Sequence, residues 1–140
     1  MYIFIFLLVL GPLWAHNPCV VGVGEPIIDY IYFVDDVFLE QQHQQKGGSN
    51  MFEFSSFEFY QKLLEKQQPH IVPGGCSANT IKGLAKLGCQ SRFIGKIGLD
   101  SSGSLFGQSL LNAGVTPNLL TTSTHTSLLL SMVTPDGERT

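Results

Sequence analysis

The sequence is poor in charged residues, in cysteine and in tryptophan. Only 14% of its 140 residues are charged, and the 8 Lys and Arg residues against 11 Asp and Glu residues give a net charge of −3. The basic residues are scattered and form neither a stripe nor an alternation with aromatic residues, the patterns that bind nucleic acid. We therefore expect no nucleic-acid partner.

The cysteine content argues against a disulfide framework. Cys19, Cys76 and Cys89 form no CxxC pair, and any one disulfide would leave one of them over. Sparse, odd-numbered cysteines are typical of reduced thiols in a cytoplasmic protein. The four histidines have no metal-ligand spacing, so no metal site is expected either.

Long apolar runs are missing except at the start of the chain. Met1 to Leu10 is almost wholly apolar but too short to span a bilayer comfortably, so no stable membrane span is predicted. As a secretory signal the segment lacks Lys or Arg ahead of the apolar run, and Leu13 fits poorly three places before a cut after Ala15. Residues 1–17 are interpreted as an extension without a folding role, with a signal-like Met1–Ala15 directing export as the alternative.

Residues 18–140 have the pattern of one α/β domain, and 44% apolar content is enough for a core. Strands are predicted at Cys19–Gly24, Ile27–Phe33, Ser91–Ile94 and Leu128–Val133, with loops at Glu40–Asn50 and Gly95–Asp100. Helices are predicted from a capping box at Ser55 and Glu58 to Pro69, around Asn79 up to Gly88, and from a cap at Asp100 or Ser101 to Gly114. Strands that alternate with helices predict a sheet with a parallel core.

Helical periodicity also predicts which side chains face inward. The helix around Asn79 is expected to bury Ala78, Ile81, Leu84, Ala85 and Leu87 and to leave Lys82 and Lys86 in solvent. The helix after Asp100 is expected to bury Leu105, Phe106, Leu110 and Ala113, and Asp100 itself is interpreted as mainly a structural helix cap.

The segment Pro73-Gly74-Gly75-Cys76-Ser77-Ala78-Asn79 is the best candidate for a binding site. Glycines at a helix start let the backbone approach a ligand, and the first-turn amides have no partner within the helix. Asn79 can donate to and accept from a polyhydroxylated ligand. A simple turn that enters a buried helix explains the same residues.

Asp29 is the second candidate, because it follows a glycine-rich strand end inside an apolar run. Its carboxylate either faces solvent or binds a hydroxyl, and ligands of open α/β sheets collect outside the carboxyl ends of the strands. If both candidates serve one ligand, the side chains of Asp29 and Asn79 lie within about 10 Å of each other. Two apparent phosphate motifs, at Gly22–Gly24 and Gly95–Ile97, lack the residues of a dinucleotide fingerprint or a P-loop and are interpreted as turn glycines.

The end of the sequence resembles an unfinished hairpin. Pro135-Asp136-Gly137 is a strong turn signal, and Thr140 follows after only a few residues. A strand without its partner exposes unpaired backbone groups. We therefore expect these residues to be a fragment of a longer protein and to be only marginally stable alone.

Taken together, these segments resemble the PfkB, or ribokinase-like, family of carbohydrate and nucleoside kinases, from Cys19 to Thr140. The resemblance is carried by the order and spacing of several pieces: Val21–Asp29, Gly74–Asn79, Ala85–Gly88, Ile94–Gly103, Leu110–Val115 and Val133–Thr140. It is closest to the adenosine kinase and fructokinase-like branches, judged from the long segment between Asp36 and His70 and the small residues beside Asn79.

The resemblance implies the N-terminal part of a Rossmann-like αβα core with a small β-sheet lid, truncated before the ATP-binding half. It implies that Asp29, Gly74, Gly75 and Asn79 contact a sugar or nucleoside, and that the full-length enzyme uses ATP and Mg²⁺ to phosphorylate a hydroxyl. The family's catalytic aspartate belongs to a Gly-Ala-Gly-Asp-like segment, which is absent from these 140 residues, so no catalytic residue is assigned here.

Three functional interpretations follow. The first is an ATP-dependent kinase of which this chain carries the substrate-binding half and lid, with the 140-residue chain itself inactive. The second is an inactive remnant that binds a sugar or nucleoside. The third, a protein exported by Met1–Ala15, weakens the kinase interpretation because ATP is scarce outside the cytoplasm. A dimer through the lid sheet is a further expectation.

Overall fold

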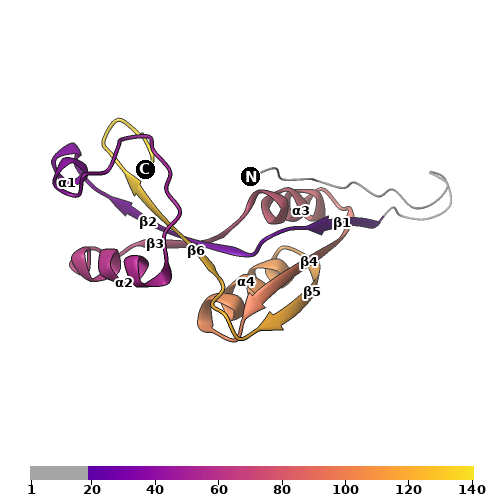
Figure 1. The fold of residues 1–140 in the computed structure, drawn as a ribbon. Coiled ribbons are helices and arrows are strands. Elements are labelled where there is room, and N and C mark those ends of the chain that lie inside the picture. The colour runs from indigo at the N-terminus through magenta and orange to yellow at the C-terminus, as the bar shows by residue number, and fades with distance from the viewer. Residues whose placement is uncertain (1–18) are drawn as a thin grey trace. The chain divides into compact units, whose positions relative to one another are not determined.

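The computed structural model describes residues 19–140, and it divides them into two compact units (Figure 1). The first unit contains the described residues up to Ile28 and then Pro73–Ser127, and the second contains Asp29–Val72 and Leu128–Thr140. The interpretations of residues 1–17 concern a part of the chain outside the described residues.

The first unit is built on a parallel sheet, as the sequence predicts. Its strands β1 (Cys19–Val23), β4 (Gln90–Gly98) and β5 (Val115–Thr122) lie in the order β1-β4-β5, with both pairs parallel. Helices α3 (Cys76–Lys86) and α4 (Ser101–Asn112) complete the unit. Each helix precedes a strand of the sheet, which is the repeating unit of α/β folds.

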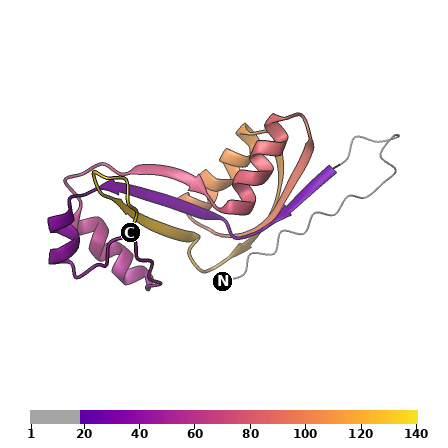
Figure 2. The ribbon, with the colours of Figure 1, turned by 90° about the horizontal axis from the view of Figure 1, so that it is seen from above.

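Both helices lie along one face of this sheet (Figure 2). Ser91 and Phe93 of β4 are buried toward the helices, whereas Arg92 and Ile94 alternate with them and are exposed. The core of this unit consists of Ala78, Ile81, Phe93, Phe106, Leu110 and Val115, each at most 3% exposed. The opposite face, where Val23, Ile94 and Leu120 remain exposed, is covered by neither α3 nor α4. Parallel sheets are usually buried on both faces.

Gly22 in β1 and Gly24 directly after it are packing residues and not the turn glycines that the sequence suggested. A Cβ at Gly22 would overlap Ile81 Cγ1, and a Cβ at Gly24 would lie 2.8 Å from Ser77 Cβ. These contacts bring the first turns of α3 onto the end of β1. The two glycines therefore let helix and strand approach more closely than any side chain would permit.

One strand boundary and one whole strand of this unit differ from the sequence prediction. Strand β4 continues through Gly98, so Gly95–Gly98 is strand and not loop. Strand β5 was not predicted at all, because Pro117 and Asn118 are typical of turns. Pro117 is tolerated because β5 pairs on only one side among the described residues, and an edge strand does not need every amide.

Helical periodicity placed most inward-facing residues correctly but not all. Ala78, Ile81, Phe106 and Leu110 are buried, as expected, and the helices stop at Gly88 (φ 89°) and Gly114 (φ 78°). Leu87 is 82% exposed and Leu105 is 42% exposed, so their inward placement was wrong. Leu87 is the C-cap that follows the last residue of α3, where helical periodicity no longer decides which way a side chain faces.

The second unit contains a smaller sheet with strand order β3-β2-β6, formed by β3 (His70–Gly74), β2 (Ile27–Phe33) and β6 (Ser127–Val133). Helices α1 (Asp36–Gln41) and α2 (Phe54–Leu63) belong to the same unit. One apolar cluster joins these elements: Tyr32, Val34, Leu39, Phe57, Leu64, Leu130 and Met132. Phe57 and Leu64 are buried members of this cluster, and the partly buried Tyr60 packs against it.

The helices of this unit begin at places that the sequence did not indicate. The short α1 was not predicted; its N-cap Asp35 accepts from the Phe38 amide at 2.8 Å. The predicted capping box at Ser55 and Glu58 was wrong, because α2 already begins at Phe54 and its N-cap is Glu53 without a side-chain hydrogen bond. Helix α2 also ends at Leu63, well before Pro69.

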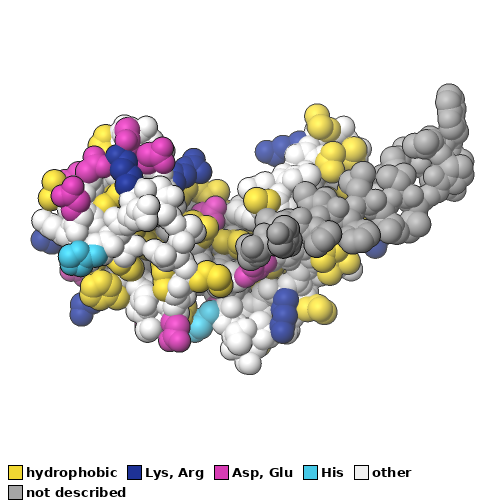
Figure 3. Space-filling view, turned by 45° about the horizontal axis from the view of Figure 1, so that its top comes forward, with side chains coloured by type: hydrophobic (Ala, Val, Ile, Leu, Met, Phe, Trp, Pro, Cys, Tyr) yellow, Lys and Arg dark blue, Asp and Glu magenta, His cyan; other side chains and the backbone are white. Residues whose placement is uncertain are grey.

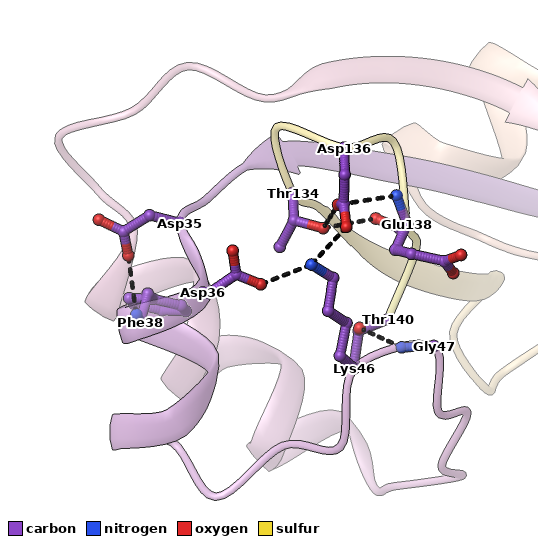
Figure 4. A network of polar contacts seen from close by, with 9 residues as sticks. All are labelled: Asp35, Asp36, Phe38, Lys46, Gly47, Thr134, Asp136, Glu138 and Thr140. Atoms are coloured by element: carbon purple, nitrogen blue, oxygen red, sulfur yellow. Dashed lines mark hydrogen bonds and ion pairs between the residues drawn. The ribbon is translucent and has the colours of Figure 1, made fainter.

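The predicted turn at Pro135–Gly137 is confirmed, and the residues after it pair back onto β6. Gly137 has φ 89°, and Met132 and Thr140 exchange backbone hydrogen bonds of 2.8 and 2.9 Å. The turn is also fastened by Lys46, whose Nζ lies 2.6 Å from carboxylate oxygens of both Asp36 and Asp136 (Figure 4). Figure 3 shows the acidic and basic side chains gathered beside each other over this unit.

The Lys46 bridge predicts an acid-sensitive contribution to stability. Hydrogen bonding from Lys46, and then from Thr134, lowers the pKa of Asp136 to about 2. A group whose pKa is lower in the folded than in the unfolded state stabilises the fold above its unfolded pKa, about 3.9, and loses that contribution as the pH falls. When the pH falls from 5 to 2, the thermal unfolding temperature of the parent should therefore drop further than that of Asp136→Asn.

The matched control for this prediction is Glu40→Gln, an exposed carboxylate in the same unit. It should follow the parent through the whole pH range. Parallel curves for the parent and Asp136→Asn would mean that the Lys46 bridge contributes nothing to stability, as is common for exposed ion pairs.

Among residues 19–140, no helix is long and apolar enough to cross a membrane.

Candidate functional site

In the first unit, the candidate site lies at the edge of the parallel sheet where the strands end. Ser77, in the first turn of α3, lies against Gly22 and Gly24 at the end of β1. Helix α4 begins at Ser101, directly after β4 ends at Gly98. Two helix N-termini therefore lie at the same edge, the one where α/β proteins bind ligands.

The two helix N-termini differ in how they are capped. Helix α4 begins with Asp100, whose Oδ1 accepts from the Gly103 amide at 2.7 Å, and this confirms its prediction as a cap. Helix α3 begins with Gly75, which has no side chain to offer, so no side-chain hydrogen bond caps that helix. The first-turn amides of α3 therefore receive no side-chain cap and can donate to an external acceptor.

Gly75 has a backbone conformation that side chains avoid. Its φ of 91° and ψ of 126° lie outside the left-handed helical region that Asn or Asp can adopt. A Cβ at this residue would also lie 2.9 Å from the carbonyl oxygen of Glu25. Two independent observations thus require glycine here: its backbone conformation and the close approach of the α3 entry to the Glu25 carbonyl.

Gly74 and Asn79 lie on either side of that helix start. Gly74 is buried at the end of β3, and Asn79 is exposed in the first turns of α3, where its backbone amide donates to the Gly75 carbonyl at 2.9 Å. The Asn79 side chain is thus exposed beside the uncapped helix start. The sequence candidates Gly74, Gly75 and Asn79 are brought together in one place.

Lys82 was expected in solvent, but it braces the same segment. Its Nζ donates to the carbonyl oxygen of Pro73 at 3.0 Å and lies 5.6 Å from the centroid of the Phe106 ring. The ammonium group thus ties the residue before the diglycine to the core. The sequence signal for this contact was a lysine nearly two turns after the helix start, combined with a proline before the diglycine.

Asp29 belongs to the second unit and follows the fully buried Ile28 in β2. Asp29 is half-buried, so its carboxylate is neither fully solvated nor fully buried. The expected proximity of Asp29 to Asn79 in the other unit stays a prediction.

Asp100 also makes contacts beyond its helix. Its two carboxylate oxygens accept from the Thr126 amide and hydroxyl, each at 2.8 Å. Burial raises the pKa of Asp100, but these hydrogen bonds and the one from Gly103, together with nearby His125, outweigh it and lower the pKa overall. The carboxylate therefore stays ionised and serves as an acceptor.

The described residues contain no group of three or more His, Cys, Asp or Glu side chains that could hold a metal ion. The carboxylates around this edge are engaged in hydrogen bonds within the fold, as Asp100 shows. The α3 start offers backbone N–H donors together with the exposed Asn79 side chain, which can both donate and accept.

The family described as "pfkB family carbohydrate kinase" matches residues 20–140 of the chain. The chain is 32% identical over 127 residues to "Probable fructokinase-5" of Arabidopsis thaliana, which covers 89% of this chain and 32% of that protein. It is 41% identical over 69 residues to "Fructokinase" of Escherichia coli, which covers 48% of this chain and 22% of that protein.

The structure is also similar to solved structures of related proteins. The adenosine kinase from Sinorhizobium meliloti superimposes with a TM-score of 0.73 at 30% identity, over 85% of this chain and 36% of that one. A probable sugar kinase from Rhizobium etli gives 0.74 at 27% identity over the same shares. The chain thus spans about a third of the length of the relatives that it matches.

Proposed function

Because the chain belongs to the pfkB family of carbohydrate kinases, we propose that it supplies the substrate-binding side of an ATP-dependent kinase acting on a hydroxyl of a sugar or nucleoside. The observation that carries the proposal is the uncapped start of α3, where Gly75 leaves backbone amides beside the exposed Asn79. Similarity to fructokinases and an adenosine kinase supports both substrate classes.

In this proposal the chain's residues bind and orient the acceptor. The backbone at Gly74 and Gly75 allows the sugar ring to approach, the Asn79 amide holds one hydroxyl, and the Asp29 carboxylate accepts from another. Orientation of this kind is a large part of catalysis in phosphoryl transfer, which depends mainly on positioning and charge stabilisation. ATP with Mg²⁺ would supply the phosphoryl group, and no step through them is assigned to residues 19–140.

A second candidate function is binding without turnover. It applies to the 140 residues alone, which contain no Gly-Ala-Gly-Asp-like segment and cover about a third of the relatives' length. We propose that the 140-residue polypeptide consumes no ATP with any sugar or nucleoside, whereas a longer form containing such a segment does. A cytoplasmic location fits either function, and a dimer through the second unit's sheet stays a prediction.

Equilibrium dialysis of the 140-residue chain with labelled fructose, ribose and adenosine tests the proposed site. We expect saturable binding of at least one of them, and a loss of roughly tenfold or more in affinity on Asn79→Ala or Asp29→Ala, because each change removes a hydrogen bond to the ligand. Asn118→Ala is the matched control: it removes an exposed amide from the uncovered face of the sheet and should leave affinity unchanged.

Two outcomes would contradict the proposal. One is binding of a labelled ligand that Asn79→Ala and Asp29→Ala leave unaffected, which would place the site elsewhere. The other is an absence of binding to a chain whose α3 amides are protected from hydrogen exchange, since a folded α3 start is the feature on which the proposal rests.

A further inference from the structure

The chain passes between the two units three times, after Ile28, after Val72 and after Ser127. At each passage a strand begins or ends in the first unit and lies mostly in the second. These three strands therefore connect the two units along the chain. The segment 124–127, which leads into the last of them, β6, is held by an unusual number of polar contacts.

Asp100 is the centre of these contacts. One carboxylate oxygen accepts from the Gly103 amide at 2.7 Å and from the Thr126 hydroxyl at 2.8 Å, and the other accepts from the Thr126 amide at 2.8 Å. The Thr126 hydroxyl in turn accepts from the Gly98 amide at 2.9 Å. A single side chain thus joins the end of β4, the first turn of α4 and the start of β6.

These contacts are buried and closely packed. Thr126 is 2% exposed, and a Cβ at Gly98 would lie 2.7 Å from the Thr126 amide nitrogen. A buried hydrogen bond is costly to break, because water cannot replace the lost partner. The next residue, Ser127, donates its hydroxyl to the Glu25 carboxylate, and the Glu25 carbonyl oxygen lies against Gly75. The three strand ends are therefore held at neighbouring points of the first unit.

We propose that Asp100 is a positioning residue for the second unit: through Thr126 it fixes the point from which β6 leaves the first unit. Capping α4 needs only one accepted hydrogen bond, the one from Gly103. The two hydrogen bonds to Thr126 do nothing for the helix, but they immobilise the segment at which the chain passes to the other unit. The exposed pair Glu25–Ser127 is a weaker second contact at the same place.

Two substitutions separate positioning from capping. Asp100→Asn keeps a good helix cap, since Asn and Asp cap equally well. With its oxygen in the cap, its NH2 group replaces the other carboxylate oxygen and cannot accept from the Thr126 N–H. Thr126→Val keeps the size and shape of the side chain and removes only the hydroxyl that joins Gly98 to Asp100. Thr126→Ser restores that hydroxyl. Thr124→Val is the control, because the Thr124 hydroxyl contacts only the exposed Thr122 hydroxyl.

Amide hydrogen exchange of the full 140-residue chain gives the first readout. Asp100→Asn should speed amide exchange at Thr126 roughly tenfold and leave Gly103 protected. Thr126→Val should speed amide exchange at Gly98 by a similar factor, because it removes the hydroxyl that accepts from that amide. Thr126→Ser and Thr124→Val should match the parent. Rapid exchange at Gly98 and Thr126 in the parent would overturn the proposal, because no fixed strand end would then exist.

Double electron–electron resonance measures the distribution of distances between a spin label in each unit, a quantity that should not change if Asp100 only caps α4. Spin labels are placed by Gln108→Cys in α4 and Glu40→Cys in α1, in a chain whose three native cysteines are alanine. Asp100→Asn and Thr126→Val should broaden the distribution of distances, and Thr126→Ser should restore the parent width. Equal widths in all variants would show that Asp100 is only a cap and would overturn the proposal.

Discussion

Phe93→Ala is expected to lower the free energy of unfolding of the first unit by about 3–5 kcal/mol, the usual cost of removing a buried aromatic side chain. Phe93 is 0% exposed in strand β4, and its ring centroid lies 5.5 Å from that of Phe106 in α4. Its ring also lies near Gly24, which directly follows β1, and near Gly95 of its own strand. A cavity here removes contacts from α4, from the end of β1 and from β4 itself.

Urea unfolding followed by circular dichroism measures this effect, and Phe33→Ala is the matched control. Phe33 is 61% exposed in the second unit, so its removal should cost well under 1 kcal/mol. If the parent is less stable than the expected loss, Phe93→Ala should show no cooperative transition at all. Equal effects of the two substitutions would mean that the first unit has no packed core around Phe93.

The sequence predicted the parallel sheet of the first unit because each part of the pattern agreed with the others. Val20 and Val21 begin a short apolar strand, Gly88 and Gly114 stop the two helices, and the alternation of strand and helix leaves few arrangements. The substrate candidates Gly74, Gly75 and Asn79 were found for a similar reason. They are close in sequence, so one helix start is enough to bring them together.

What the sequence missed depends on contacts between distant segments. Thr126 is 26 residues from Asp100, and no local pattern reveals that its hydroxyl and amide complete the carboxylate's hydrogen bonds. Strand β5 escaped prediction because Pro117 is acceptable only at an edge, and the edge is a property of the sheet. The tight packing of Gly22 against Ile81 likewise arises only when α3 lies on β1.

Gly75→Ala is expected to destabilise the first unit by roughly 2–4 kcal/mol, the combined effect of backbone strain and overpacking. Alanine avoids φ 91° with ψ 126°, and its Cβ would lie 2.9 Å from the Glu25 carbonyl oxygen, which is backbone and cannot move aside alone. The α3 start must therefore shift away from the end of β1. Because that start is the proposed binding site, affinity for the labelled sugar or nucleoside should fall with it.

Two other glycines, Gly83 within α3 and Gly88 directly after it, separate the effect of backbone strain from that of overpacking. Gly83 lies in the interior of α3 with nothing within 4 Å of an added Cβ, so Gly83→Ala should stabilise the chain by roughly 0.5–1 kcal/mol through better helix propensity. Gly88 has φ 89° but also open space around it, so Gly88→Ala should cost about 1–2 kcal/mol from strain alone. Urea unfolding of the three variants should rank Gly83→Ala above the parent, then Gly88→Ala, then Gly75→Ala. If Gly75→Ala is as stable as Gly88→Ala, the Glu25 carbonyl yields to the added side chain. If Gly75→Ala still binds the ligand as the parent does, the α3 start is not part of the binding site.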